Sequence, residues 1–290
     1  MERETITVVT GASRGAGKGI AIALGEAGAI VYVTGRSIGG DNEFGGSVME
    51  TAAAVTEAGG KGIPVIVDHS DDKAVASLFD QVRTSYGRLD ILVNNAAKLN
   101  NQVALPVPFW EKSLDSVDLL TVGLRSHYVS SYYAAPLLMA NGRGLIVHTG
   151  HYGAVSYYGG PIYGAQKAGS DKMVADMARE LRPFNVAAVS IWMAGLDTER
   201  SRAYISSLPV EARPNAKRES PQFTGRVISA LYHSDQLMRL SGQALIGAEL
   251  GLQFGVRDID GSQPESYRYS MGHPPILHPS LTGLADGITI

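Results

Sequence analysis

TITVVTGASRGAGKGIAIALGEAGA, residues 5–29, contains the pattern that decides the fold. Its first six residues are β-branched or apolar and end at Gly11, so they predict a buried strand. Further glycines stand at 15, 17 and 19, and a segment with helical spacing ends near Gly28. A strand, a glycine turn and a helix in this order present backbone N–H groups and the positive end of a helix to a phosphate. We therefore expect a nucleotide site here, although glycines needed only for a tight turn would give the same spacing.

Strands and helices are predicted to alternate along the rest of the chain. Apolar strands are expected at 30–33, 62–67, 89–93, 144–147, 186–192 and 243–247, and helices at 48–58, 73–86, 114–139 and 163–181. Because each strand is nearly all apolar, the sheet should be parallel and covered by helices on both faces. The predicted fold class is therefore α/β, a doubly wound parallel sheet in a single domain over residues 1–290.

Composition excludes several classes of protein. With 44% hydrophobic and 18% charged residues, the chain should bury a large core. A net charge of −3 predicts no general affinity for nucleic acid or for anionic membranes. There is no cysteine, which excludes disulfides, thiol catalysis and thiolate metal sites, and we expect no metal. No segment resembles a signal peptide or a membrane helix, so we expect a cytoplasmic protein.

A tyrosine and a lysine in the motif YGAQK are the first candidates for catalysis. Tyr163 and Lys167 stand four residues apart at the start of a segment with helical spacing. Four residues make one helical turn, so the two side chains share a face. A nearby ammonium favours phenolate over phenol, and Lys167 would lower the pKa of Tyr163 from about 10 towards a range useful for acid/base chemistry. Two unrelated helix residues would show the same spacing.

Arginines at two turns bear on the choice of nucleotide. In a doubly wound sheet the end of the second strand faces the adenosine ribose, where an acidic residue selects NAD and an arginine accommodates a 2′-phosphate. The acidic position is occupied by Gly35, and Arg36 follows it. Arg14 in the glycine turn would add a second positive charge. The sequence therefore predicts NADP(H) as the preferred cofactor, with NAD(H) possible.

Two loops and a tail are candidates for contact with substrate. Residues 98–112 contain prolines together with Phe109 and Trp110. This loop would either roof a pocket beyond the carboxyl ends of the strands or form an oligomer contact, and both readings stay open. Residues 195–222 are polar with three prolines, which suggests a mobile lid. The tail from about 262 is rich in glycine and proline, and its sequence does not indicate what it covers.

Several motifs in this order resemble the short-chain dehydrogenase/reductase family over roughly residues 5–262. They are TGASRGAG at 10–17, Asp68 after the third strand, NNAA at 94–97 and YGAQK at 163–167. Residues 95–110 and 122–131 resemble most closely one little-described subgroup with a mammalian member. The resemblance implies a Rossmann fold and an NAD(P)-dependent oxidoreductase that interconverts a carbonyl and an alcohol.

The resemblance also implies roles for individual residues. Tyr163 would be the general acid/base, and Lys167 would lower its pKa and bind the nicotinamide ribose. The other residues expected at the cofactor are Gly11, Ser13, Arg14, Ala16 and Gly17 around the pyrophosphate and ribose, Arg36, Asp68, Asn94 and Ala96 on the adenosine side, and Thr198 at the carboxamide. The implied partners are a small carbonyl or alcohol substrate and a second copy of the chain, since dimers or tetramers through the helices at 114–139 and 163–181 are common in the family.

Departures from the family pattern concern residues that bind the substrate carbonyl. The family's serine is missing, and its place falls on His151 when the strand is aligned or on Gly150 when thirteen residues are counted back from Tyr163. The family's asparagine is replaced by Gly123, and its proline-glycine pair by Met193 and Ala194. Loss of one oxyanion-type donor costs about 2.7–4 kcal/mol in the transition state where nothing replaces it.

His151 is the candidate replacement for the serine. An imidazole N–H donates hydrogen bonds, and its pKa lies near neutrality. A solvated loop histidine is the alternative. The leading hypothesis is an NADP(H)-dependent carbonyl reductase or alcohol dehydrogenase. Two others remain, a catalytically silent nucleotide-binding sensor or assembly protein, and a redox-neutral enzyme such as a dehydratase in which a His–Tyr pair moves protons alone.

Overall fold

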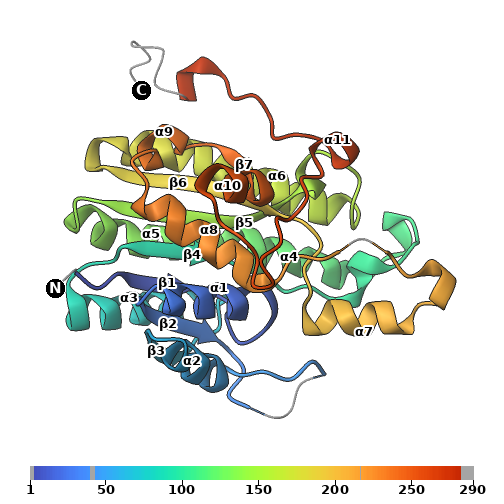
Figure 1. The fold of residues 1–290 in the computed structure, drawn as a ribbon, viewed down its shortest axis with the longest axis horizontal. Helices are drawn as coiled ribbons and strands as arrows, with labels where there is room; N and C mark the ends of the chain where they lie inside the picture. The colour runs from blue at the N-terminus through green and yellow to red at the C-terminus, as the bar shows by residue number, and fades with distance from the viewer. Residues whose placement is uncertain (1–2, 40–42, 216, 282–290) are drawn as a thin grey trace.

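The computed structural model describes residues 3–39, 43–215 and 217–281. In this part of the chain, seven parallel strands form one sheet in the order β3-β2-β1-β4-β5-β6-β7 (Figure 1). The strands are β1 (Ile6–Val9), β2 (Ile30–Gly35), β3 (Lys61–Ile66), β4 (Ile91–Asn94), β5 (Gly144–His151), β6 (Val186–Met193) and β7 (Ala244–Ile246). The predicted α/β class with a doubly wound parallel sheet is confirmed.

The direction of the strand order reverses at β1, which is the first strand of the chain and lies near the middle of the sheet. β1 pairs with β2 through Ile6 and Ile30, and with β4 through Thr7 and Ile91. The connections on the two sides of β1 therefore leave the sheet in opposite directions. In open α/β sheets ligands bind at such a point, beyond the carboxyl ends of the strands.

Helices cover both faces of the sheet (Figure 1). One core cluster packs α1 (Gly15–Glu26), α2 (Val48–Glu57) and α8 (Pro221–His233) on the first face. A second cluster packs α3 (Asp72–Tyr86), α5 (Ser126–Ala140) and α6 (Pro161–Leu181) on the other. The remaining α-helices in the described part are α4 (Asp118–Leu120), α7 (Glu199–Ser207), α9 (Leu237–Leu240), α10 (Gly247–Phe254) and α11 (Arg268–Met271).

The helix predicted over 114–139 is wrong as one continuous element. A 3₁₀ turn at Leu114–Val117 leads into α4, and a π-helical segment at Thr121–Arg125 separates α4 from α5. Within this segment Val122 and Gly123 have non-helical dihedrals, with φ of +150° at Gly123. Only glycine adopts such an angle readily, because it has no Cβ. The interruption lies directly beside α6, the helix that carries Tyr163 and Lys167.

Residues 195–222 contain ordered elements that the sequence did not indicate. α7 begins at Glu199, and the Thr198 hydroxyl caps it by accepting a hydrogen bond from the Ser201 N–H at 3.2 Å. The two ends of the segment meet at a β-bridge between Leu196 and Glu219. α8 follows at once and was also missed. The mobility of this segment as a lid stays a prediction.

The first residues of the tail pack against Tyr152, in the turn that follows β5. The Tyr267 N–H donates to the hydroxyl of Tyr152 at 3.1 Å, and the two rings lie 6.3 Å apart. Arg268 donates to both carboxylate oxygens of Glu249. Tyr152 in turn packs its ring against that of Trp192 at 5.3 Å. The tail therefore buttresses the loop that follows β5, and residues 282–290 lie outside the described part.

Some of the apolar side chains predicted to form an oligomer contact are instead buried in the core of the same chain. Leu137 is buried in the core on α5, whereas Tyr132 on the same helix is 64% exposed. An exposed aromatic side chain thus remains available on α5, and the homo-oligomer stays a prediction.

Among the helices of the described ranges, none combines the length and the apolar character needed to cross a bilayer.

Close contact between α1 and α8 depends on glycine. A Cβ at Gly19 would lie 2.2 Å from the Cβ of Pro221, which no packed side chain tolerates. We expect Gly19→Ala to lower the free energy of unfolding by about 1–3 kcal/mol, since this clash outweighs the gain in helix propensity. Urea denaturation measures the change. Gly39→Ala is the matched control, because a Cβ at Gly39 meets nothing within 4 Å. Equal stability of the two variants would contradict the packing described.

Candidate active site

The tyrosine and lysine of α6 face the carboxyl end of β5. The helix begins at Pro161, so both side chains fall within its first two turns. The Lys167 ammonium donates to the carbonyl oxygen of Thr149 at 2.8 Å and lies 5.6 Å from the centre of the Tyr163 ring. Both side chains are buried. The shared face predicted from their spacing is therefore confirmed, and a hydrogen bond ties that face to β5.

Burial dominates the electrostatics of this pair. It raises the pKa of Tyr163 well above its ordinary value, and the nearby Tyr158 adds to the increase. Burial also lowers the pKa of Lys167 to about 8, and Asp171 partly offsets that effect. The pKa of Asp171 itself is raised to about 6 by burial, while the Trp192 indole N–H donates to its carboxylate at 3.0 Å. Burial thus shifts the pKa of Tyr163 upward, opposite in direction to the lowering that the sequence predicts.

His151 lies next to Tyr163 and is held in one tautomer. The ring centres of the two side chains are 5.6 Å apart, and the Tyr158 ring lies 4.5 Å from the imidazole on another side. The Gly153 N–H donates to Nδ1 of His151 at 2.9 Å. Burial and the charge of Lys167 lower the pKa of His151 to about 3. At neutral pH the ring is therefore uncharged, with its proton on Nε2, where it serves as a donor.

Gly150 has no room for a side chain. A Cβ at this position would lie 2.4 Å from Oγ of Ser190 and 2.4 Å from Cδ1 of Trp192. Successive residues of a strand point to opposite faces, so the side chain of His151 points the other way. Of the two positions that the sequence left open for the missing serine, the structure brings His151 beside Tyr163.

Gly123, which stands where the family has an asparagine, also has little room for a side chain. A Cβ at Gly123 would lie 3.1 Å from Cδ1 of Leu119, and the positive φ at this position adds strain for any other residue. The Gln166 amide donates to the Gly123 carbonyl oxygen at 2.7 Å. Gln166 stands one residue before Lys167, and no motif or spacing in the sequence indicates its role. Its amide bridges the interruption between α4 and α5 to the catalytic helix.

Two buried histidines lie behind the lysine. The rings of His127 and His148 are 4.9 Å apart, and Nε2 of His127 contacts the Ala96 carbonyl oxygen at 3.2 Å. Burial lowers the pKa of His148 to about 3 and that of His127 well below its usual value. Both rings are therefore neutral.

The glycine turn packs against the end of β4. Gly11 has φ of +65°, and a Cβ there would lie 2.6 Å from Cα of Ala96. The Asn95 amide donates to the carbonyl oxygens of Thr10 and Gly11 at 2.9 and 3.0 Å. A Cβ at Gly17 would lie 2.5 Å from the same amide nitrogen. Asn95 therefore fixes the turn, a role that its place in the NNAA motif did not reveal.

The two arginines predicted for the 2′-phosphate already have partners. The Arg14 guanidinium donates to the Ser37 hydroxyl at 2.5 Å, which joins the glycine turn to the end of β2. Arg36 lies 3.7 Å from the Asp68 carboxylate, and both side chains are well exposed. Hydrogen bonds from Ser70 lower the pKa of Asp68, and Arg36 contributes. The structure brings these residues to the same corner of the sheet.

The other residues predicted to bind the cofactor differ in how much of each is accessible to a ligand. Ser13 and Ala96 are buried at the turn, and Ala16 is half-buried. The Asn94 side chain is fully buried and donates to the Ser131 hydroxyl at 2.9 Å, so only its backbone is available to a ligand. Thr198 lies close to the turn, since a Cβ at Gly15 would be 3.8 Å from its methyl group.

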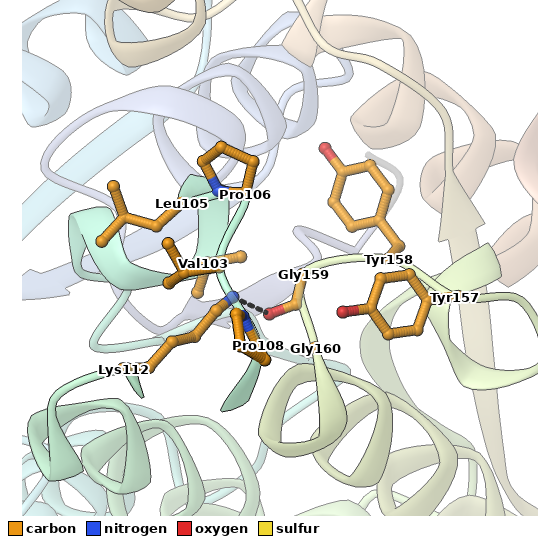
Figure 2. Close-up of a pocket in the computed structure, with 10 residues that line it drawn as sticks. Val103, Leu105, Pro106, Pro108, Lys112, Tyr157, Tyr158, Gly159 and Gly160 are labelled. Carbon is orange, nitrogen blue, oxygen red and sulfur yellow. Dashed lines mark hydrogen bonds between the residues drawn. The ribbon is translucent and has the colours of Figure 1, made fainter. Parts of the chain in front are cut away.

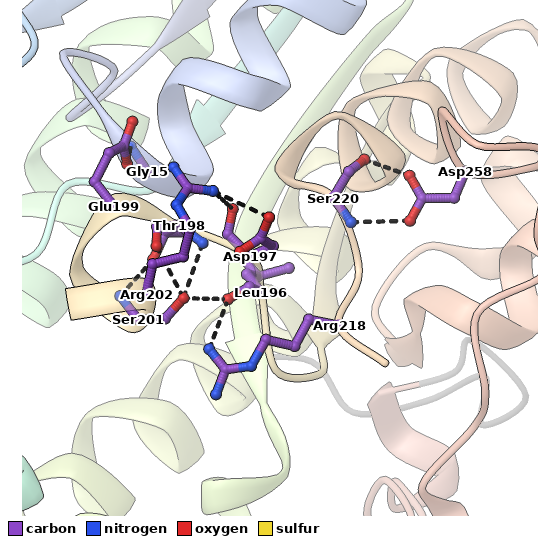
Figure 3. Close-up of polar contacts among 10 residues, drawn as sticks. All are labelled: Gly15, Leu196, Asp197, Thr198, Glu199, Ser201, Arg202, Arg218, Ser220 and Asp258. Atoms are coloured by element: carbon purple, nitrogen blue, oxygen red, sulfur yellow. Dashed lines mark hydrogen bonds and ion pairs between the residues drawn. The ribbon is translucent and has the colours of Figure 1, made fainter. Parts of the chain in front are cut away.

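A carboxylate from α7 lies at the beginning of α1 (Figure 3). The Gly15 N–H donates to Oε2 of Glu199 at 3.1 Å, across 184 positions of sequence. α1 has no acidic residue in its first turn and no side-chain cap of its own. Glu199 therefore supplies the negative charge that a helix N-terminus attracts. The N–H of Gly15 is thus accessible to a negatively charged group.

The sequence of the chain matches a known family. The model of the short chain dehydrogenase family matches residues 5–207. The chain is 37% identical over 286 residues to Dehydrogenase/reductase SDR family member 1 of Mus musculus, covering 92% of this chain and 87% of that protein. The chain belongs to the short-chain dehydrogenase/reductase family. The protein of the same name from Homo sapiens is 37% identical over 277 residues, covering 90% of this chain and 85% of that protein.

Solved structures of short-chain dehydrogenases share the fold. A short chain dehydrogenase from Mycobacterium thermoresistibile aligns with a TM-score of 0.74 at 22% identity, covering 88% of this chain and 89% of that one. The family and fold predictions are confirmed, including the resemblance to a subgroup with a mammalian member. As a short-chain dehydrogenase/reductase, the chain is an oxidoreductase that uses a nicotinamide dinucleotide.

Proposed function

We propose that the chain is an NADP(H)-dependent carbonyl reductase in which His151 replaces the serine of the family. The observation that carries the proposal is the neutral imidazole of His151, fixed by the Gly153 N–H and 5.6 Å from the Tyr163 ring. Its remaining N–H provides the hydrogen bond to a substrate carbonyl oxygen that the serine hydroxyl would otherwise give.

The residues of α6 supply the rest of the chemistry. Burial keeps the Tyr163 phenol protonated, which suits a group that gives its proton to the carbonyl oxygen during reduction. Lys167, held by the Thr149 carbonyl, places a positive charge beside the phenol and stabilises the phenolate formed when the proton leaves. A bound nicotinamide supplies the hydride for the carbonyl carbon. The protein contributes position, a proton and a donor for the oxygen.

Residues at the carboxyl ends of β1 and β2 would hold the nucleotide. The glycine turn and the N–H of Gly15 suit the diphosphate, because they already accept a carboxylate. Arg14 and Arg36 stand where a 2′-phosphate is expected, and Gly35 leaves that corner without the acidic side chain that selects NAD. This arrangement supports NADP(H) as the preferred nucleotide.

The pKa of His151 argues against the redox-neutral alternative. A dehydratase that uses a His–Tyr pair needs a histidine that takes up a proton near neutral pH. Burial holds the pKa of this imidazole near 3, so it stays neutral throughout that range. Its role is then donation of a hydrogen bond. The silent nucleotide-binding alternative predicts that the wild type binds NADPH but reduces no carbonyl in the substrate panel below.

We expect Tyr163→Phe to abolish carbonyl reduction while NADPH affinity stays nearly unchanged, because the phenol supplies the proton.

His151→Ala should lower kcat by about 10²–10³, the cost of one lost oxyanion donor. Steady-state kinetics with a panel of aldehydes and ketones, and NADPH fluorescence titration, measure the two effects. His233→Ala removes an exposed histidine and is the control. Full activity of His151→Ala would show that its ring only packs in the loop.

Arg36→Ala should weaken NADPH binding by about tenfold or more and leave NADH binding nearly unchanged, because only NADPH carries the 2′-phosphate. The dissociation constants come from titrations followed by nicotinamide fluorescence. Arg83→Ala is the matched control, since Arg83 forms an exposed ion pair with Asp80 far along α3. Equal losses for both nucleotides would overturn the 2′-phosphate assignment.

Glu199→Gln should tighten NADPH binding by about fivefold. The carboxylate of Glu199 lies where the diphosphate is expected, so it must leave that N–H and its charge repels the phosphates. Isothermal titration calorimetry measures the affinity. Glu211→Gln removes an exposed carboxylate from the same segment and serves as the control for net charge. Unchanged or weaker binding in Glu199→Gln alone would mean that the contact does not compete with the nucleotide.

A further inference from the structure

A cavity of about 490 Å³ lies between the two loops that border the catalytic residues (Figure 2). Aliphatic and proline side chains from residues 103–108 form one wall, and Tyr157, Tyr158 and two glycines form the other. The side chains of the first wall are apolar, the second wall adds polar atoms, and the volume falls in the range of small-molecule sites. Of the two sequence-based readings of the loop at 98–112, this cavity favours the pocket wall, while Phe109 and Trp110 stay mostly exposed.

The cavity adjoins the catalytic tyrosine. The Tyr158 ring, which lines it, lies 5.5 Å from the ring of Tyr163 and 4.5 Å from that of His151. A Cβ at Gly159 would lie 3.1 Å from Cβ of Tyr163 and 2.7 Å from Val103 on the opposite wall. Tyr158 and Gly159 therefore line the cavity on one side and contact Tyr163 on the other.

One lysine, Lys112, extends between the two walls. Its ammonium donates to the Gly159 carbonyl oxygen at 3.2 Å (Figure 2), and it is the one charged group among the residues that line this cavity. Within the described ranges no carboxylate lies within ion-pair distance of it. An ammonium has three N–H donors, so two are left beside an apolar surface, where an ionic hydrogen bond is stronger than in water.

We propose that this cavity binds a carbonyl substrate that carries a carboxylate, with Lys112 as the residue that holds the carboxylate. The inference rests on the carbonyl reductase proposed above and names its substrate class, a keto acid with an apolar chain. A single lysine suits a carboxylate, whereas a phosphate would call for several donors or an arginine fork. In the reaction the carbonyl carbon gains a hydride from reduced nicotinamide and the oxygen gains the proton of Tyr163, giving a hydroxy acid and the oxidised nucleotide.

A structural tether is the competing explanation for Lys112, since its bond to Gly159 joins the two loops. The two roles differ in their effects on matched substrates. A tether supports the pocket whatever the substrate carries, so its loss lowers turnover of charged and neutral compounds alike. A carboxylate contact acts only on the acid.

The test uses linear keto acids of increasing chain length and the methyl ester of each, with NADPH. The wild type should prefer one acid over its ester, and Lys112→Met should raise KM for that acid by about 10- to 100-fold while leaving the ester nearly unchanged. Lys112→Arg should recover much of the preference. Lys98→Met is the matched control, because Lys98 lies in the same loop and pairs with Asp118.

Equal losses for acid and ester in Lys112→Met, or no preference in the wild type, would overturn the inference. Calorimetric titration of the NADP⁺ complex with the matching hydroxy acid and its ester measures binding without turnover. It therefore tests the carboxylate site independently of the proposed reductase activity. If no carbonyl is reduced, the reductase proposal fails. Lys112-dependent binding of the acid would still support the carboxylate site, and its absence would reject it.

Discussion

A hydrogen bond between the Lys167 ammonium and the Thr149 carbonyl oxygen joins the catalytic helix to the central sheet. A buried charge is costly unless polar groups compensate it, so this contact fixes both partners. β5 continues three residues beyond its last pair with β4, beside the equally long β6, and its last residue, His151, lies beside Tyr163. The position of each catalytic group thus depends on one strand end.

Electrostatics around this bond favour neutral groups. His127 and His148 are buried and His151 is partly buried near the ammonium, and desolvation together with its charge lowers the pKa of each ring. The phenol of Tyr163 also stays in its neutral form. The lysine is therefore the positive charge around which the site is organised, and the pKa of Asp171 is raised by the same burial. The histidines and the phenol therefore stay neutral around neutral pH, while Lys167, with a pKa lowered to about 8, and Asp171, with a pKa raised to about 6, are the groups that titrate there.

Features that depend on local sequence were predictable. Apolar runs between glycine turns located the seven strands, and the spacing of Tyr163 and Lys167 placed them on one face. The break at Gly123 was not predictable, because a φ of +150° leaves no mark on hydrophobic spacing. Contacts between distant segments were missed for a related reason. Glu199 meets Gly15 only once the chain has folded, and its exposed helix has no apolar stripe that points to the turn. The sequence predicted a lowered pKa for Tyr163, whereas burial raises it, because the spacing of two residues does not show how deeply they are buried.

The lack of space at Gly150 limits which substitutions the loop after β5 can accept. Ser190 and Trp192 leave no volume for any side chain there, so a hydroxyl could return to the catalytic centre only at position 151. That exchange would remove the ring that packs against Tyr158 and the acceptor for the Gly153 N–H. Replacement of the imidazole at position 151 therefore costs the loop one ring contact and one hydrogen bond, besides its effect on the chemistry.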